Sequence, residues 1–473
     1  MILTKELIQK SVEEVAPLIK DKSVSPVELT EAVLDHAEAN QDSINAYTNF
    51  TRGNALKAAK KAESEIISGK YRGMYHGIPM ALKDNIYIKN EVTTMSSKIH
   101  SDFVPNHDAT VVEKLREAGA IFTGKLNMHE YAWGATNNSP HFGPCHNPWN
   151  LEKISGGSSG GSGAALTSDM TMASLGTDTG GSVRIPAALC GIVGLKQTYG
   201  RVSNYGSFPL AWTLDHIGPM TKSVKDAVAL LKIIAGYDKR DITSVQYPVD
   251  DYMSYVTGDV KDLVIGVNED YFFKQVDHGI EKAVRKTIKA LENQGAKVAE
   301  VKIPSLKYSE WAVMTTIISE PAAIHKDNHL NRPNDFGEDL QFLFDLGELP
   351  SAVDYIQAQQ IRRHLKQDFM KAFEEVDVLI SPTLPISTPE IGEDTVNLNG
   401  EEVDLLDHII RFTGPGNITG LPALSVPCGF NGNMPVGMQI MGKAFDEKTI
   451  LNVGYAVEKM NLLNGRKPSN VQY

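Results

Sequence analysis

Glycine and hydroxyl side chains are concentrated between residues 154 and 206 as nowhere else in the chain. Five glycines there surround Ser158 and its serine neighbours, and glycine lets the backbone adopt conformations that side chains forbid. The apolar run at residues 170–176 predicts a short buried strand, which ends just before Ser182. A serine in a small-residue loop directly after a strand is a candidate nucleophile. We therefore assign Ser182 this role.

The loop before Ser182 also offers backbone donors. Small residues leave N–H groups unobstructed, and several of them can point at one developing negative charge. We expect an oxyanion hole from the N–H groups of Thr179, Gly180, Gly181 and Ser182.

A serine nucleophile needs a base, which is usually a histidine held by a carboxylate. No histidine lies between His146 and His216, and the nearer candidate is Lys83, which follows an apolar stretch that could bury it. Lowering a lysine pKa from ~10.4 to about 7–8 costs roughly 3–4 kcal/mol, which burial can supply. We expect Lys83 to be neutral at rest and to act through an intermediate hydroxyl.

Three segments in order, residues 77–84, 156–162 and 176–186, together resemble the amidase signature family. Further segments at residues 124–130, 194–202 and 421–427 extend the resemblance to nearly the whole chain. The resemblance implies a triad in which Ser182 is the nucleophile, Ser158 the bridging serine and Lys83 the base. It also implies a cis peptide bond between Gly157 and Ser158.

Three neighbouring residues are expected to support this site. Ser159 follows the bridging serine in the glycine-rich loop. Asp178 and Arg184 flank Ser182 and are six residues apart, and we interpret them as a structural ion pair that holds the loop, not as proton carriers.

For the fold, the resemblance implies a single large α/β/α domain over residues 1–473, with a mixed twisted sheet covered by helices and a catalytic core segment at 73–220. The patterns agree: strand–helix–strand units are predicted within 73–125 and 263–301. A helical stretch is predicted over 309–373, with breaks near its prolines, Pro321, Pro333 and Pro350.

Composition excludes several classes of protein. With 473 residues and 42% apolar residues, the chain can bury a sizeable core. Its net charge of −12 argues against direct nucleic-acid binding. Its three cysteines form no C-x-x-C pair, which favours a reducing, cytoplasmic location. Neither an apolar leader nor a membrane span is expected.

Other motifs are incomplete. The glycine-rich loop lacks the G-K-[ST] of a P-loop and the third glycine of a dinucleotide fingerprint, and His129-Glu130 with Cys145-His146 does not complete a zinc deaminase motif. Gly156-x-Ser158-x-Gly160 matches a nucleophile elbow in letters, but no strand precedes it. We expect no cofactor and no metal.

The favoured function is a free-standing serine amidohydrolase, a monomer or homodimer, that cleaves small amides or carbamates, and esters by the same acyl-enzyme chemistry. The alternative is the glutaminase subunit of the glutamyl-tRNA(Gln) amidotransferase, a family member that works only in a complex. That subunit is expected to hold glutamine with an arginine and an aspartate; Arg362 is present, but Ile410 occupies the aspartate position. A non-catalytic binding protein ranks third.

Overall fold

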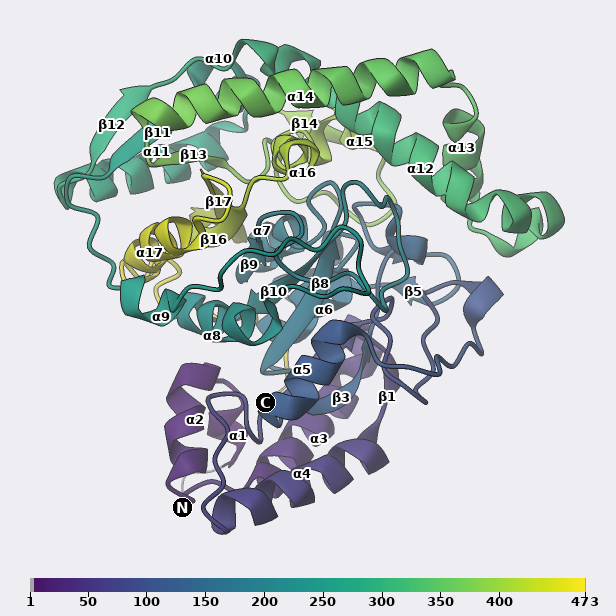
Figure 1. Cartoon of the computed structure of the whole chain (residues 1–473), viewed down its shortest axis with the longest axis vertical. Helices are drawn as coiled ribbons and strands as arrows, with labels where there is room; N and C mark the ends of the chain where they lie inside the picture. Colours follow the sequence, from purple (N-terminus) through teal and green to yellow (C-terminus); the bar gives the residue numbers. More distant parts are fainter. Residues whose placement is uncertain (1–3, 473) are drawn as a thin grey trace.

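The computed structural model describes residues 4–472. Residues 1–3 and residue 473 lie outside the described part. The start of the predicted domain, where an apolar leader would also start, therefore falls outside it. Eleven strands form one sheet in the order β1-β3-β2-β8-β10-β9-β16-β17-β13-β11-β12 (Figure 1). Parallel and antiparallel pairs both occur, so the sheet is mixed as predicted. These strands are β1 Tyr47–Phe50, β2 Pro79–Lys83, β3 Ile121–Leu126, β8 Ala173–Asp178, β9 Val193–Lys196, β10 His216–Thr221, β11 Val264–Val267, β12 Lys297–Glu300, β13 Val378–Pro382, β16 Ala423–Asn431 and β17 Met434–Gly442.

Short two-stranded ladders add β4 Asn138–Ser139 to β5 Gly143–Pro144, β6 His146–Asn147 to β7 Asn150–Ile154, and β14 Thr395–Leu398 to β15 Glu401–Asp404. The α-helices are α1 Thr4–Leu7, α2 Val12–Lys20, α3 Pro26–Ile44, α4 Arg52–Ile67, α5 Thr110–Ala118, α6 Gly160–Thr167, α7 Arg184–Cys190, α8 Val224–Ile234, α9 Tyr252–Tyr255, α10 Glu269–Phe272, α11 His278–Asn293, α12 Ser309–Asn331, α13 Glu338–Gly347, α14 Ala352–Glu375, α15 Leu405–Ile409, α16 Gly414–Thr419 and α17 Glu447–Glu458.

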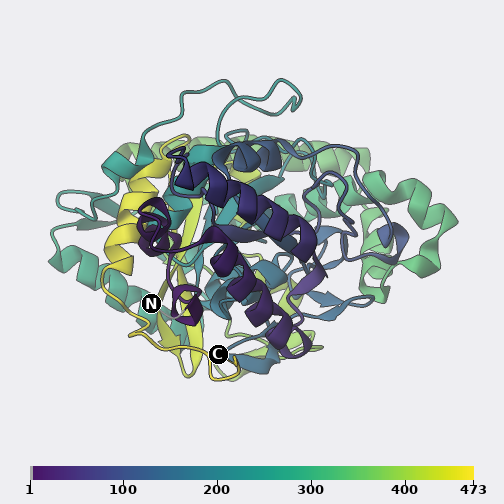
Figure 2. The same cartoon turned by 90° about the horizontal axis from the view of Figure 1, so that it is seen from below.

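Helices cover the sheet in groups. α6 and α7 pack on each other, while α5, α8 and α17 form a second group, which α11 joins through its contact with α17. At one end of the sheet α3 packs with α4 against β3, as the view from below shows (Figure 2). At the other end α12, α13 and α14 pack on one another (Figure 1). The predicted α/β/α architecture is confirmed.

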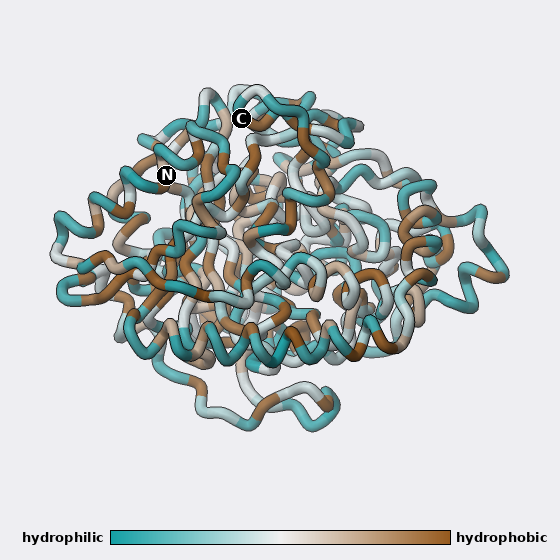
Figure 3. The backbone as a smooth tube through the Cα atoms, turned by 90° about the horizontal axis from the view of Figure 1, so that it is seen from above, coloured by the Kyte–Doolittle hydropathy of each residue, from teal (hydrophilic) through white to brown (hydrophobic). Residues whose placement is uncertain are grey.

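Hydropathy follows this layering. Hydrophobic segments lie mainly in the interior, while the outer loops are mostly hydrophilic (Figure 3). The strands that carry the candidate site, β2 and β8, are buried at every position. Within residues 4–472 no helix combines the length and the apolar character needed to cross a membrane.

Both predicted strand–helix–strand units are present. β2, α5 and β3 form one with β2 and β3 parallel, and β11, α11 and β12 form the other. Ser25 caps α3 by accepting the N–H groups of Val27 and Glu28, as its position before a proline suggests.

The predicted break at Pro321 is wrong. α12 runs without interruption from Ser309 to Asn331, and Pro321 lies buried inside it. A proline removes one backbone hydrogen bond, and the packing of α12 against α13, α14 and α16 stabilises the helix despite this loss. The chain does leave the helix near Pro333 and Pro350, because α13 and α14 begin after them.

Candidate active site

Lys83 is the last residue of β2 and is completely buried. Its Nζ lies 2.7 Å from Ser158 Oγ and 2.7 Å from Thr177 Oγ1. Burial holds the pKa of Lys83 well below its usual value, and the negative charges of Asp178 and Asp215 oppose this shift only in part. An amine whose protonated form burial disfavours therefore lies within hydrogen-bond distance of the Ser158 hydroxyl.

The loop that carries Ser158 is fixed by close packing. The peptide bond between Gly157 and Ser158 is cis, as expected. A Cβ on Gly157 would lie 2.8 Å from the Ala135 carbonyl carbon, so only glycine fits. Ser159 ties the loop to β8, because its Oγ donates to the Thr177 carbonyl at 3.2 Å and accepts the Thr177 N–H at 3.3 Å.

Ser182 lies in the turn between β8 and α7 and is 7% exposed. In the described part of the chain, the backbone N–H groups of Gly180, Gly181 and Ser182 donate to no acceptor. Gly181 has φ +136°, and a Cβ there would lie 2.2 Å from Thr413 Oγ1. The turn therefore places a hydroxyl and three unused donors together.

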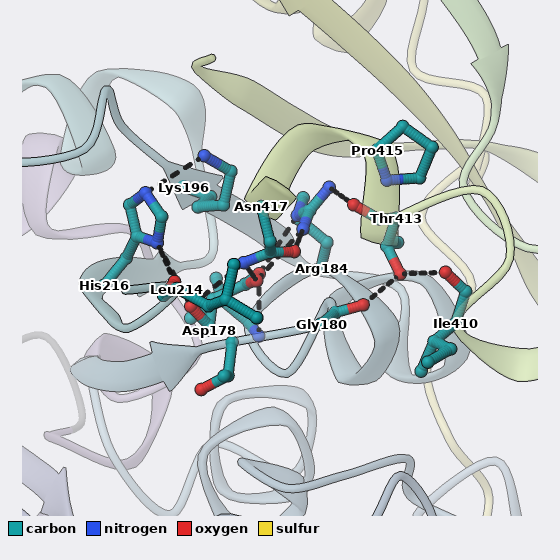
Figure 4. A network of polar contacts seen from close by, with 12 residues as sticks. Asp178, Gly180, Arg184, Lys196, Leu214, His216, Ile410, Thr413, Pro415 and Asn417 are labelled. Carbon is teal, nitrogen blue, oxygen red and sulfur yellow. Dashed lines mark hydrogen bonds and ion pairs between the residues drawn. The ribbon is translucent and has the colours of Figure 1, made fainter. Parts of the chain in front are cut away.

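Behind this turn, Arg184 forms the expected ion pair with Asp178 (Figure 4). Its Nε and Nη2 donate to the two carboxylate oxygens of Asp178, each at 3.0 Å. Its remaining hydrogen bonds reach the Thr413 carbonyl at 2.9 Å and the side chains of Gln439 and Asn417, each at 2.6 Å. Burial would raise the pKa of Asp178, but Arg184 holds it below its usual value. The pair is buried and its polar atoms are hydrogen-bonded, which agrees with a structural role.

Two cavities flank the site. A small one of about 50 Å³ has Ser182 and Gly180 in its wall, and the rest of its wall is apolar: Ala132, Trp133, Gly134, Ala135, Leu210, Met314, Ile317, Ile318, Leu343, Leu406 and Ile410. A larger one of about 590 Å³ reaches Thr177, the neighbour of Lys83, and shares Leu210 with the first.

Ile410 and Arg362, the two residues considered for glutamine binding, lie in different surroundings. Ile410 lines the small cavity, whereas Arg362 does not. The Arg362 guanidinium donates to the Thr213 carbonyl at 2.8 Å. The apolar wall at Ile410 agrees with the sequence observation that the ammonium-binding aspartate is missing.

Sequence reasoning missed two residues of the site. Thr177 bonds Lys83, and its position directly before Asp178 at the end of a predicted strand was an available signal. Asp215 accepts the hydroxyl of Thr179 at 2.6 Å, and no motif marked it. Within residues 4–472 no three His, Cys, Asp or Glu side chains gather as a metal site would require.

Known proteins match this chain over most of its length. A model of the Amidase family matches residues 28–451. The A subunit of the glutamyl-tRNA(Gln) amidotransferase from Carboxydothermus hydrogenoformans is 40% identical over 487 residues, covering 98% of this chain and 99% of the relative.

Solved structures also match this chain over most of its length. One, described as a vestigial protein complex that reveals the evolutionary origins of an s-triazine catabolic enzyme, has a TM-score of 0.92 at 31% identity and covers 96% of this chain and 99% of its own. The A subunit of the glutamyl-tRNA(Gln) amidotransferase from Thermotoga maritima has a TM-score of 0.82 at 33% identity, with 97% and 96% covered.

Two expectations are corrected by these relatives. The expectation of a free-standing amidase is wrong, because relatives that match from end to end are named as one component of an amidotransferase. That expectation relied on the single position Ile410 more than on the similarity of the rest of the chain.

The expectation of a monomer or homodimer without nucleic acid is wrong for the same reason. The net charge of one chain describes that chain alone, and an assembly can handle tRNA on other surfaces. The expected C–N hydrolase chemistry is confirmed. The chain belongs to the amidase signature family.

Proposed function

We propose that this chain is the glutamine-hydrolysing component of a glutamyl-tRNA(Gln) amidotransferase. The observation that carries the proposal is the 40% identity with the A subunit of such an enzyme over 98% of the chain. In this role the chain releases ammonia from a carboxamide and a partner consumes it. The buried Lys83–Ser158 contact and the free donors at residues 180–182 support the hydrolytic step.

The first half of the reaction forms an acyl-enzyme. The Ser182 proton moves to Ser158, and the Ser158 proton moves to Lys83, whose neutral amine can accept it. Ser182 Oγ attacks the carboxamide carbon, and the N–H groups of Thr179, Gly180, Gly181 and Ser182 stabilise the resulting oxyanion. The relay then reverses, the nitrogen is protonated, and the C–N bond breaks to release ammonia.

The second half restores the enzyme. Water enters where ammonia left and gives up a proton through Ser158 to Lys83. Its oxygen attacks the acyl carbon, and the bond to Ser182 breaks as Ser182 recovers its proton. The product is a carboxylate, which is glutamate when the substrate is glutamine. Asp178 and Arg184 hold the loop throughout, and Ser159 keeps the Ser158 loop against β8.

The sheet order supports a catalytic core at residues 73–220. β3, β2, β8, β10 and β9 are consecutive in the sheet and derive almost entirely from this segment. We also propose a cytoplasmic location, since the three cysteines are free and buried.

The test measures ammonia released from L-glutamine by the purified chain, alone and after co-expression with the partner subunits encoded in the same genome. We expect release in the complex, together with conversion of glutamyl-tRNA(Gln) to glutaminyl-tRNA(Gln). Ser182→Ala in the same complex is the control and should abolish both. A small carbamate and a small amide serve as comparison substrates, and a complex that cleaves these but never glutamine would overturn the proposal.

A further inference from the structure

Asp215 joins two loops at the edge of the site. It directly precedes β10 and lines the larger cavity. Its carboxylate accepts hydrogen bonds from three donors: Thr179 Oγ1 at 2.6 Å, the Leu210 N–H at 2.9 Å, and the Ala211 N–H, which lies 3.1 Å from both carboxylate oxygens. Thr179 begins the loop that leads to Ser182, and Leu210 lies in the wall of both cavities. One side chain therefore sets the spacing between the nucleophile loop and the cavity wall.

The charge of Asp215 is also unusual in its surroundings. Two carboxylates, Asp178 and Asp215, act on Lys83. Asp178 acts on Lys83 more strongly than Asp215 does, but the Asp178 carboxylate is paired at two points with Arg184. Among the described residues, Asp215 has no cation within ion-pair distance. When Lys83 takes up the proton that Ser158 passes on, it becomes a buried ammonium, and Asp215 is the carboxylate acting on it that no cation pairs with.

The pKa of Asp215 is raised but stays below neutral pH. Burial raises its pKa to about 6, and the hydrogen bonds from Thr179, Ala211 and Leu210 oppose a larger rise. Glu320 of α12 adds to the rise. The other titratable or charged groups near it are Lys83 on β2, Tyr199, whose pKa Asp215 helps to raise, His216 as the next residue, and Arg240 with Asp241 in the cavity wall.

We propose that Asp215 is a positioning residue of the proton relay: it fixes the nucleophile loop through Thr179 and supplies the negative charge that stabilises Lys83 while Lys83 holds the proton. The inference rests on the relay of the proposed function. It assigns Asp215 no contact with the substrate.

The first experiment compares pH profiles of kcat/KM for Asp215→Asn and the wild type. Asparagine keeps the size of the side chain and an acceptor for Thr179 but removes the charge. Without that charge Lys83 loses its proton more readily, so the acidic limb moves to lower pH by about half to one unit. The plateau rate falls about tenfold or more, because the protonated Lys83 is less stabilised. A purely structural role would lower the rate and leave the limb in place.

Asp226→Asn is the matched control. Asp226 is also a buried aspartate whose pKa is raised to about 6, and it also accepts two backbone N–H groups, those of Val12 and Glu13. It lies on α8 and does not act on Lys83. Its replacement should leave the limb unmoved.

A second pair of variants tests the positioning role and does not depend on the folding of Asp215→Asn. Thr179→Val removes the hydroxyl that Asp215 accepts, and we expect a loss of about tenfold or more in kcat/KM. Thr179→Ser restores the hydroxyl and should recover most of the activity. Equal activity of Thr179→Val and the wild type would overturn the positioning role, and an unmoved limb in folded Asp215→Asn would overturn the charge role.

Each rate is measured with L-glutamine in the complex and with 4-nitrophenyl acetate, whose cleavage reports the attack by Ser182 without glutamine recognition. If the wild type cleaves the ester but not glutamine, the proposed function fails while Asp215 can still be tested. If the wild type cleaves both and the variants match it, the inference about Asp215 fails alone.

Discussion

Lys83 and Thr177 meet because β2 and β8 are parallel neighbours in the sheet, and the Lys83 Nζ lies 2.7 Å from the Thr177 hydroxyl. The same amine lies 2.7 Å from Ser158, which a separate loop delivers. Two independent elements therefore hold the amine in place, so its position does not depend on the substrate. Preorganisation of this kind lowers the cost of proton transfer.

Replacement of Ser182, Ser158 or Lys83 by alanine should each lower kcat/KM for glutamine by about 10³-fold or more. The three residues act as one relay, so the double variants should fall little further. Circular dichroism should show that each variant is folded. Near-native turnover by Ser182→Ala would rule out Ser182 as the nucleophile. Labelling by a serine-directed phosphonate, mapped by mass spectrometry, checks the assignment independently.

The pH dependence follows from the buried lysine. Burial lowers the pKa of Lys83, and the amine must be neutral to accept the Ser182 proton. Activity should therefore be low where Lys83 is protonated and should rise with pH through its lowered pKa, well below the range of an exposed lysine. Lys83→Arg should be inactive over the accessible range, because guanidinium stays protonated. A limb that survives Lys83→Ala and disappears on replacement of a histidine would instead identify that histidine as the base.

The buried ion pair makes a prediction about stability. Asp178→Asn leaves Arg184 buried without a counter-charge, and breaking a buried pair from one side costs about 3–5 kcal/mol. Urea denaturation should show this loss. The exposed pair of Lys289 and Glu292 is the control, since Lys289→Ala should change stability by less than about 1 kcal/mol. Equal effects of the two variants would contradict a structural role for Arg184.

The local patterns were enough to predict much of the fold. Apolar runs that alternate with a helical pattern predicted the β2-α5-β3 and β11-α11-β12 units, because each unit follows from local periodicity. Pro321 was mispredicted because local sequence does not contain the packing of α12 on α13 and α14. Local sequence also does not determine the order of the strands in the sheet, where β10 lies between β8 and β9.

Part of the candidate site could likewise be predicted from the sequence, and part could not. Ser158, Ser182 and Lys83 stand in recognisable motifs, and the structure brings Lys83 to Ser158. Asp215 lies in no recognisable motif. Its place in the site results from the antiparallel pairing of β10 with β8, which sets His216 opposite Asp178. This pairing brings Asp215 beside Thr179. The proposed role of the chain in a complex could not be read from charge or from the single residue Ile410.

The last prediction concerns Ile410 and glutamine. The α-ammonium of glutamine carries a positive charge, and the cavity beside Ser182 presents Ile410 and other apolar side chains where a carboxylate would pair with it. Placing a charge against apolar groups is costly. The complex should therefore bind glutamine weakly, and Ile410→Asp should lower KM for glutamine about tenfold, with a smaller effect on kcat.

Ile410→Asn is the matched control for this substitution, because it adds a polar group of the same size without charge and should not reproduce the gain. The measurement is ammonia release against glutamine concentration for the three complexes. If Ile410→Asp leaves KM unchanged while all three complexes hydrolyse glutamine, the ammonium lies elsewhere. Two acidic groups beside the small cavity are then the next to replace: Asp407 and Glu310 line the adjoining hollow, which shares Met314, Leu406 and Ile410 with it. A rise in KM on Asp407→Asn or Glu310→Gln would place the ammonium on that side of Ile410.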